Sequence, residues 1–288
     1  MSSISIQNLN KTYAKKGQAY QVLKDFNLEI NSGEFVTVFG QNGSGKSTML
    51  NLIAGLDEAD NGEILIAGKS NKESKVGFVF QNYNESMLPW RTVEGNIRLG
   101  LEGETTPKTF LSPLNRCTSS DLKSTPFKGS ERSSGGCVRE TANKISNLLI
   151  QTGLESIKNK LFFELSGGQK QLTAIARSFA FEPDIMLLDE PFSALDYSVT
   201  KKMQLKIMEM WQNYNHNFSQ KLLTILFISH DLDEAIFLAD KIVILSPRPG
   251  RIKEIIEVKL PRPRTLDMLE SEEFFELRKK VLDVFQYE

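Results

Sequence analysis

Apolar side chains in the first 80 residues occur in short runs that turn residues separate. Residues 35–39 form a compact, largely apolar run, which predicts a buried strand, and residues 22–30 alternate well enough for another strand. The apolar positions of residues 47–54 have helical spacing, and this helix is expected to end at Gly55. Further strand candidates lie at residues 4–9, 63–67 and 76–80.

Helical and strand patterns alternate through the second half of the chain. Helices are expected at residues 92–101, 140–152, 167–181, 198–211 and 232–238. Strands are expected at residues 185–188, 223–229 and 241–245, with a hairpin arm at 250–258 and an amphipathic helical tail at 269–285. Such alternation predicts an α/β fold whose sheet is mostly parallel and flanked by helices.

Two polar segments interrupt this pattern. In residues 103–136, 12 of the 34 side chains are Ser or Thr, so the segment cannot bury enough apolar surface to offset its ordering entropy. We expect it to be a flexible insertion outside the core. Residues 213–220 are expected to form a second, smaller insertion after the helix that ends at Trp211.

Composition narrows the class of protein. The 288 residues are 40% hydrophobic and carry 35 basic and 36 acidic side chains, which is typical of a globular protein and gives no electrostatic case for nucleic acid as the main partner. No apolar run approaches the ~20 residues of a membrane span, and the first residues lack a secretory pattern. The two cysteines, Cys117 and Cys137, form no disulfide framework and favour a reducing compartment.

A glycine-rich loop joins the strand at 35–39 to the helix at 47–54 and matches the P-loop pattern. It comprises Gly40, Gln41, Asn42, Gly43, Ser44, Gly45, Lys46 and Ser47. Such a loop turns its backbone N–H groups toward phosphate oxygens, next to the positive end of the helix. Lys46 is expected to reach the β- and γ-phosphates, and Ser47 to place its hydroxyl on Mg²⁺.

Acidic and basic side chains follow two predicted strands. Asp189 and Glu190 end the apolar run at 185–188, and His230 follows the strand at 223–229. In a parallel sheet these residues share one edge with the P-loop, where Asp189 could hold the metal, Glu190 could act as the base for the attacking water, and His230 could hydrogen-bond the γ-phosphate. Without the other motifs, a polar cap at the start of the next helix would be the favoured interpretation of His230.

A third motif precedes the helix at 167–181. Ser166, Gly167, Gly168 and Gln169 follow Leu165, and small residues at a helix N-terminus suit an anion. A simple N-cap by Ser166 would explain the serine equally well. The residues alone do not say which phosphate such a site would bind.

In this order, the motifs resemble those of the ATP-binding subunits of ABC transporters over nearly the whole chain. The match is the P-loop at 40–48, which adds Thr48, the signature at 165–169, the pair Asp189-Glu190, and His230. Further positions match the Q-loop glutamine, the D-loop aspartate and the aromatic residue that stacks on adenine. These are Gln81, Asp196 and Tyr13.

The resemblance implies a P-loop NTPase with a RecA-like core, antiparallel β elements and a helical subdomain. The single domain would span residues 1–288. It would comprise a core at about 1–86 and 171–260, a helical subdomain at about 87–170, and a tail at 261–288. ATP and Mg²⁺ are the implied cofactors, with Gln81 joining Ser47 and Asp189 at the metal and Lys46, Gln81, Glu190 and His230 in catalysis.

The resemblance also implies partners. Two ATPase subunits, identical or related, would close head-to-tail, so that each signature caps the partner's ATP, beneath a membrane-spanning permease at the cytoplasmic face of the membrane. Residues 87–97, 245–252 and 260–264 look like those of importers for nitrate, sulfonates and taurine, which also use a periplasmic or extracellular substrate-binding protein. Leu172 stands where the family commonly has arginine.

The same residues bear on two other functions. The signature, the D-loop and the post-strand histidine argue against a P-loop kinase or GTPase. An ABC ATPase of a soluble complex, such as one for iron–sulfur cluster assembly, stays open as an alternative to the importer.

Overall fold

The computed structural model describes the chain except for residues 1, 16, 83–85, 103–134, 218–221 and 287–288. Its contacts divide the described chain into two units. Unit 1 consists of residues 1–81 and 182–288, and unit 2 of residues 82–102 and 135–181.

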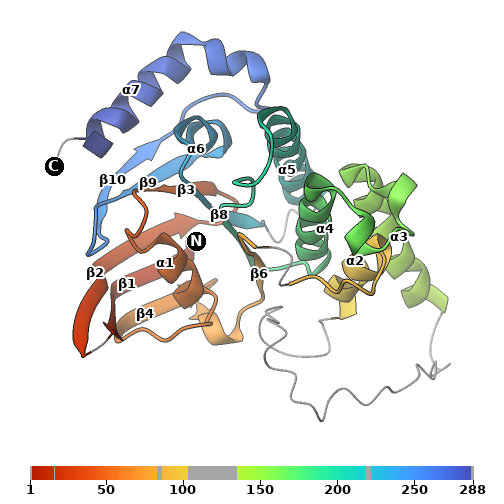
Figure 1. Cartoon of the computed structure of the whole chain (residues 1–288), viewed down its shortest axis with the longest axis horizontal. Coiled ribbons are helices and arrows are strands. Elements are labelled where there is room, and N and C mark those ends of the chain that lie inside the picture. Colours follow the sequence, from red (N-terminus) through yellow and green to blue (C-terminus); the bar gives the residue numbers. More distant parts are fainter. Residues whose placement is uncertain (1, 16, 83–85, 103–134, 218–221, 287–288) are drawn as a thin grey trace. The chain divides into compact units, whose positions relative to one another are not determined.

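A six-stranded sheet forms the centre of unit 1 (Figure 1). Its order is β10 (Ile252–Glu257), β9 (Lys241–Leu245), β3 (Phe35–Phe39), β8 (Thr224–Ser229), β7 (Ile185–Asp189) and β6 (Val76–Val79). All neighbours pair in parallel except β10, which is antiparallel to β9. Every residue of β3, β7 and β8 is buried, as their predominantly apolar sequences predict. The α/β prediction is confirmed.

A second, antiparallel sheet completes unit 1. Its order is β2 (Gln18–Asn31), β1 (Ser2–Lys15), β4 (Asn61–Ile66) and β5 (Lys69–Ser70). The helices of this unit are α1 (Lys46–Ile53), α5 (Tyr197–Asn217), α6 (Leu232–Leu238) and α7 (Glu272–Gln286). Helix α6 packs on β3, where the Thr37 hydroxyl donates to the Ala235 carbonyl at 3.1 Å.

Unit 2 is built from α2 (Val93–Glu102), α3 (Gly135–Thr152) and α4 (Gly167–Ala180), which contact one another. Gly100 permits the closest approach, because a Cβ there would lie 2.4 Å from the Arg177 carbonyl oxygen. Arg177 is buried, and its Nη1 donates to the Ser86 carbonyl at 2.6 Å. The grouping of α4 with this unit differs from the expectation that residues from 171 onward belong to the core.

Helix α5 continues to Asn217, beyond the expected end at Trp211 and into the predicted insertion at residues 213–220. The extension has a physical reason: Trp211 Nε1 donates to the Leu223 carbonyl at 2.8 Å, and the Leu223 amide donates to Asn215 Oδ1 at 2.7 Å. These bonds make the polar end of the helix part of its attachment to β8. The larger predicted insertion lies outside the described residues, except that α3 already begins at Gly135.

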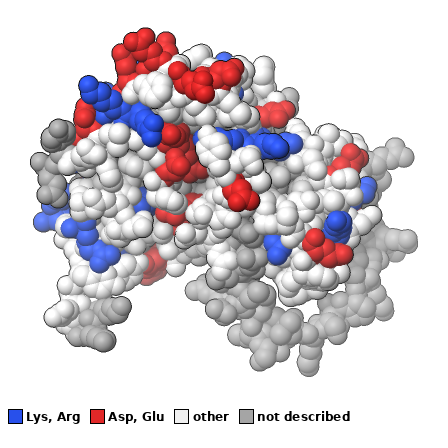
Figure 2. Space-filling view, turned by 45° about the horizontal axis from the view of Figure 1, so that its top comes forward, with Lys and Arg blue, Asp and Glu red and all other residues white. Residues whose placement is uncertain are grey.

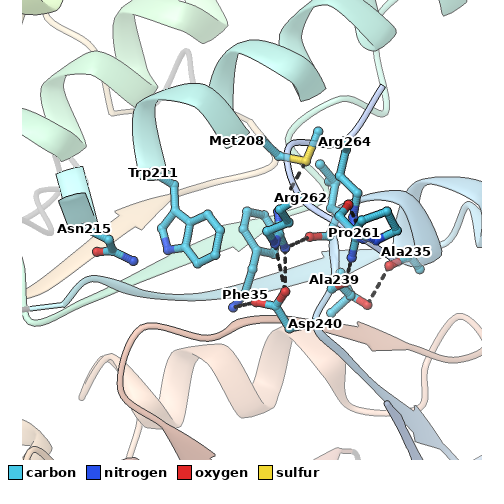
Figure 3. Close-up of polar contacts among 12 residues, drawn as sticks. Phe35, Met208, Trp211, Asn215, Ala235, Ala239, Asp240, Pro261, Arg262 and Arg264 are labelled. Carbon is cyan, nitrogen blue, oxygen red and sulfur yellow. Dashed lines mark hydrogen bonds and ion pairs between the residues drawn. The ribbon is translucent and has the colours of Figure 1, made fainter. Parts of the chain in front are cut away.

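An arginine anchors the segment that follows β10 (Figure 3). Arg262 Nε donates to Asp240 Oδ1 at 2.9 Å, and its Nη2 donates to the Leu238 carbonyl at 2.8 Å. Its guanidinium carbon lies 4.5 Å from the ring centre of Trp211. The other Asp240 oxygen accepts from the Phe35 amide at 2.9 Å. This network therefore connects the tail, α5, the α6–β9 turn and the start of β3.

Replacing Arg262 by Ala is expected to lower the free energy of unfolding by about 2 kcal/mol, the usual scale for losing charge-assisted hydrogen bonds. Arg262→Lys should recover less than half, because an ammonium cannot reproduce the planar fork. Denaturant titration of both variants measures this. Unchanged unfolding midpoints would contradict the assigned anchor.

Positive and negative side chains are interspersed over the face shown in Figure 2. Within the described residues, no helix combines the length and the apolar character that crossing a bilayer requires.

Candidate nucleotide site

Three adjacent strands bring the predicted residues of unit 1 to one sheet edge. Strand β8 lies between β3 and β7, and all three run parallel. The P-loop follows β3, Asp189 ends β7 with Glu190 next, and His230 follows β8. The expectation that these residues share an edge is confirmed by the strand order.

The P-loop is shaped by residues that tolerate a positive φ. Gly45 has a φ of 97° and is the N-cap of α1, and a Cβ there would lie 2.9 Å from Leu23 Cδ2. Lys46 is buried, and its Nζ donates to the carbonyl oxygens of Gly40 at 2.7 Å and Gln41 at 3.1 Å. Burial lowers the pKa of Lys46, while the charges of Glu190 and Asp189 oppose this shift.

The side chains of Ser47 and Asp189 bring two potential metal-ligand oxygens together. The Ser47 hydroxyl donates to Asp189 Oδ1 at 3.2 Å. Burial raises the pKa of Asp189, and the Ser47 hydrogen bond partly opposes this shift. A buried carboxylate next to a hydroxyl is an arrangement that a hard divalent cation would stabilise.

Glu190 is the central polar residue of this edge. One of its oxygens, Oε2, accepts from Gln81 Nε2 at 3.3 Å and lies 3.1 Å from His230 Nδ1. Its φ of 43° places it in the left-handed region, which is strained for a non-glycine residue and frequent at functional sites. The Glu190 amide donates to the Ile228 carbonyl at 3.2 Å and so fixes the residue against β8.

A cavity of about 480 Å³ opens over this loop. Its lining is Tyr13, Tyr20, Val22, Asn42, Gly43, Gly45, Lys46, Ser47, Thr48, Gln81, Glu190 and Arg248. Most of the predicted nucleotide-binding side chains in unit 1 therefore face one space. Asp196, in contrast, is exposed and is absent from this lining.

Tyr13 lines the cavity, and its phenol hydroxyl already makes a hydrogen bond. The hydroxyl donates to Asp57 Oδ2, and Lys11 Nζ lies 4.8 Å from the ring centre. Burial, followed by the Asp57 hydrogen bond, raises the pKa of Tyr13 to about 12. The phenol therefore keeps its proton, and the Tyr20 ring lies 5.9 Å away.

Sequence reasoning missed three residues of the lining, Tyr20, Val22 and Arg248. The Arg248 guanidinium lies 5.2 Å from the Tyr20 ring centre, and its Nε donates to the Gly43 carbonyl at 3.3 Å. Gly250 explains how the loop that carries Arg248 reaches the P-loop. Its amide donates to the Val22 carbonyl at 2.7 Å, and a Cβ at this position would lie only 2.1 Å from the Ser44 carbonyl oxygen. The Pro-Arg-Pro-Gly sequence was the available signal.

The signature residues belong to unit 2. Ser166 is the exposed N-cap of α4: its Oγ accepts from the Gln169 amide at 3.4 Å, and Gln169 Oε1 accepts from the Ser166 amide at 3.0 Å. This reciprocal pair is a capping box, so the N-cap interpretation of Ser166 is confirmed. The cap leaves the remaining N-terminal amides of α4 available for an anion.

Comparisons with known proteins agree with this geometry. Residues 23–193 match the family described as ABC transporter. The chain is 37% identical over 287 residues to an uncharacterized ABC transporter ATP-binding protein of Methanocaldococcus jannaschii, covering 99% of this chain and 92% of that protein. It is also 37% identical over 287 residues to an aliphatic sulfonates import ATP-binding protein of Bacillus cereus, covering 99% and 96%.

Among solved structures, a dimeric ATP-binding cassette in a post-hydrolysis state, bound to ADP and Pi, has a TM-score of 0.64 and 29% identity. The match covers 90% of this chain and 100% of that one.

Proposed function

The chain belongs to the ABC transporter family as an ATP-binding subunit with ATPase activity, and we propose that it powers the import of a small anion such as a sulfonate, taurine or nitrate. The observation that carries the proposal is the end-to-end similarity to an aliphatic sulfonates import ATP-binding protein, together with the cavity over Lys46. The two similar proteins are a transporter ATP-binding protein and an importer ATP-binding protein, and neither supports the competing role in a soluble assembly complex.

In the proposed mechanism, the P-loop amides and Lys46 hold the β- and γ-phosphates, with Tyr13 at the adenine. Lys46 is already directed across the loop by the Gly40 and Gln41 carbonyls, so binding exchanges these acceptors for phosphate oxygens. Glu190 orients and deprotonates the attacking water, and His230 contacts both Glu190 and the γ-phosphate.

The residues at this edge fit a magnesium ion. Ser47 and Asp189 offer a hydroxyl and a carboxylate oxygen 3.2 Å apart, and Gln81 offers an amide oxygen next to Glu190. Oxygen ligands with room for water and phosphate are what Mg²⁺ prefers. When bound, the ion would neutralise charge that develops on the phosphates. The role of this chain is to hold the donors close together at the end of β7.

A second ATPase subunit completes the site in this proposal. The exposed α4 N-terminus at Ser166 suits a γ-phosphate supplied by a partner, and the similar cassette bound to ADP and Pi is described as dimeric. Gly167, Gly168 and Gln169 extend that surface, and Asp196 lies in the predicted D-loop. Closure would exclude water and assemble the site only around bound ATP.

The proposed partners are a membrane-spanning permease and an extracytoplasmic substrate-binding protein, with the subunit bound peripherally at the cytoplasmic face. Deletion of the gene is expected to abolish growth on a sulfonate as sole sulfur source, with rescue by the wild-type chain and no rescue by Glu190→Gln. Co-purification with a permease tests the partner. Unaffected uptake of sulfonates, taurine and nitrate by the deletion strain would refute the importer proposal.

Arg248 is proposed as a further nucleotide contact, because its guanidinium lies at the cavity beside the Gly43 carbonyl. Arg248→Ala is expected to weaken ATP binding about 10-fold, corresponding to one charge-assisted hydrogen bond. Titration with a fluorescent ATP analogue measures this, and Arg251→Ala is the matched control. An equal loss in both variants would indicate a general effect of the loop instead.

A further inference from the structure

A second cavity, of about 240 Å³, shares Glu190 and lies toward α5 and the turn after β8. Its lining includes Lys201 and Gln204 of α5, His230, and Glu234 of α6. Glu234 is buried, with 7% of its surface exposed, and the proposed mechanism assigns it no role. A buried carboxyl this close to the catalytic edge needs an account of its hydrogen bonds.

The hydroxyl of Ser229 has more neighbours than it has protons. Ser229 Oγ accepts from the Asp231 amide at 2.9 Å, lies 3.1 Å from the Asp231 carbonyl oxygen, and contacts Glu234 Oε2. Its single proton can serve only one of these two oxygens. With a proton on Glu234, that carboxyl donates to Ser229, Ser229 donates to the Asp231 carbonyl, and all three contacts are satisfied. With Glu234 ionised, one acceptor loses its donor.

The surroundings of Glu234 favour the protonated form. Gln204 Nε2 donates to the other oxygen, Oε1, at 2.9 Å, so that Oε2 is the oxygen free to carry the proton. Burial raises the pKa of Glu234 to about 7; the Ser229 and Gln204 hydrogen bonds and the Lys201 charge oppose the shift, and the Asp231 charge adds to it.

The turn that Ser229 closes carries His230 between its two ends. Both Ser229–Asp231 hydrogen bonds bracket this residue. The His230 side chain is 55% exposed, so the turn, rather than side-chain packing, holds its ring 3.1 Å from Glu190. The turn therefore determines whether the pair is correctly arranged.

We propose that Glu234, carrying a proton, is a positioning residue that closes the Ser229–Asp231 turn and thereby holds His230 against Glu190. This inference rests on the proposed function, because it takes Glu190 and His230 to act in hydrolysis. It adds a dependence of turnover on a proton that neither of those residues binds.

The test compares Glu234→Gln with Glu234→Ala in the full chain. A glutamine reproduces the protonated carboxyl, because its oxygen accepts from Gln204 and its NH₂ donates to Ser229. The wild-type kcat for ATP is expected to fall as the pH rises through about 7, and Glu234→Gln should keep the low-pH rate and lose this fall. Glu234→Ala should lose about 10- to 100-fold in kcat with little change in KM, as for a misplaced catalytic group.

Ser229→Ala is the second variant in case Glu234→Ala does not fold, and it should show the same loss of kcat. An unaltered pH fall in Glu234→Gln, or wild-type turnover in Ser229→Ala, would overturn the inference.

Stability supplies a readout independent of hydrolysis. The folded pKa of Glu234 lies above the unfolded value of 4.5, so the native state binds the proton more tightly. Its contribution is therefore present below pH 4.5 and is lost as the pH rises toward about 7. Glu234→Gln should lack this slope in denaturant titrations.

Wild-type turnover in His230→Ala would refute the proposed role of His230 itself. Loss of turnover in His230→Ala with full activity in Glu234→Ala would refute the positioning role of Glu234 alone.

Discussion

Glu190→Gln is expected to lower the rate of ATP hydrolysis by about 10²–10⁴-fold, the usual cost of removing a general base, while ATP binding persists. The structure shows why the effect should be confined to chemistry. Glu190 Oε2 faces Gln81 and His230, and an amide oxygen at the same place still accepts hydrogen bonds from both. The substituted side chain has the same size, and the substitution does not change the strained backbone φ of 43°.

Steady-state phosphate release and size-exclusion chromatography with ATP measure the two consequences. If hydrolysis is the step that reopens the dimer, the variant should accumulate as an ATP-bound dimer. Glu254→Gln is the matched control, since this exposed glutamate of β10 lies outside both cavities and should leave turnover unchanged. Turnover within a few-fold of wild type would remove Glu190 from the role of base.

The sequence predicted the sheet edge because that edge depends on local order. Runs of four apolar residues, 185–188 and 225–228, are followed by Asp189 and by Ser229-His230, and parallel strands deliver such ends to one side. The strand order β3-β8-β7 was needed only to confirm that they are neighbours.

Contacts between distant segments could not be predicted in the same way. Arg248 reaches the P-loop because Gly250 pairs with Val22 across more than 200 positions of sequence. The end of α5 likewise depends on bonds from Trp211 and Asn215 to Leu223, whereas its local composition is polar and favours a loop. In both places tertiary contacts override the local pattern.

The helix at 167–180 shows a third kind of limit. Its N-terminal capping box is local and can be read from Ser166 and Gln169. Its membership of a unit depends on which helices pack against it, and Gly100 of α2 makes that approach to Arg177 possible. A single glycine in a helix does not indicate which other helix packs against it.

Lys46→Met is expected to weaken ATP binding by about 2–5 kcal/mol, which is about 30- to 5,000-fold, because it removes the charged partner of buried phosphate oxygens. The same change should not destabilise the fold. Burial lowers the pKa of Lys46 below the unfolded value of 10.5. The unfolded chain therefore binds this proton more tightly than the native chain does. The buried ammonium therefore costs stability at neutral pH, and replacing it by an apolar chain of similar length removes that cost.

Isothermal titration with ATP and denaturant unfolding, run on the same preparations, separate these two effects. Lys69→Met, on the exposed strand β5, is the control for loss of a surface lysine and should change neither quantity. Reduced stability with normal ATP binding would show that Lys46 serves the loop alone, through its bonds to Gly40 and Gln41. Lost binding at equal or higher stability is the combination expected of a lysine that the fold holds in place, at a cost, for phosphate.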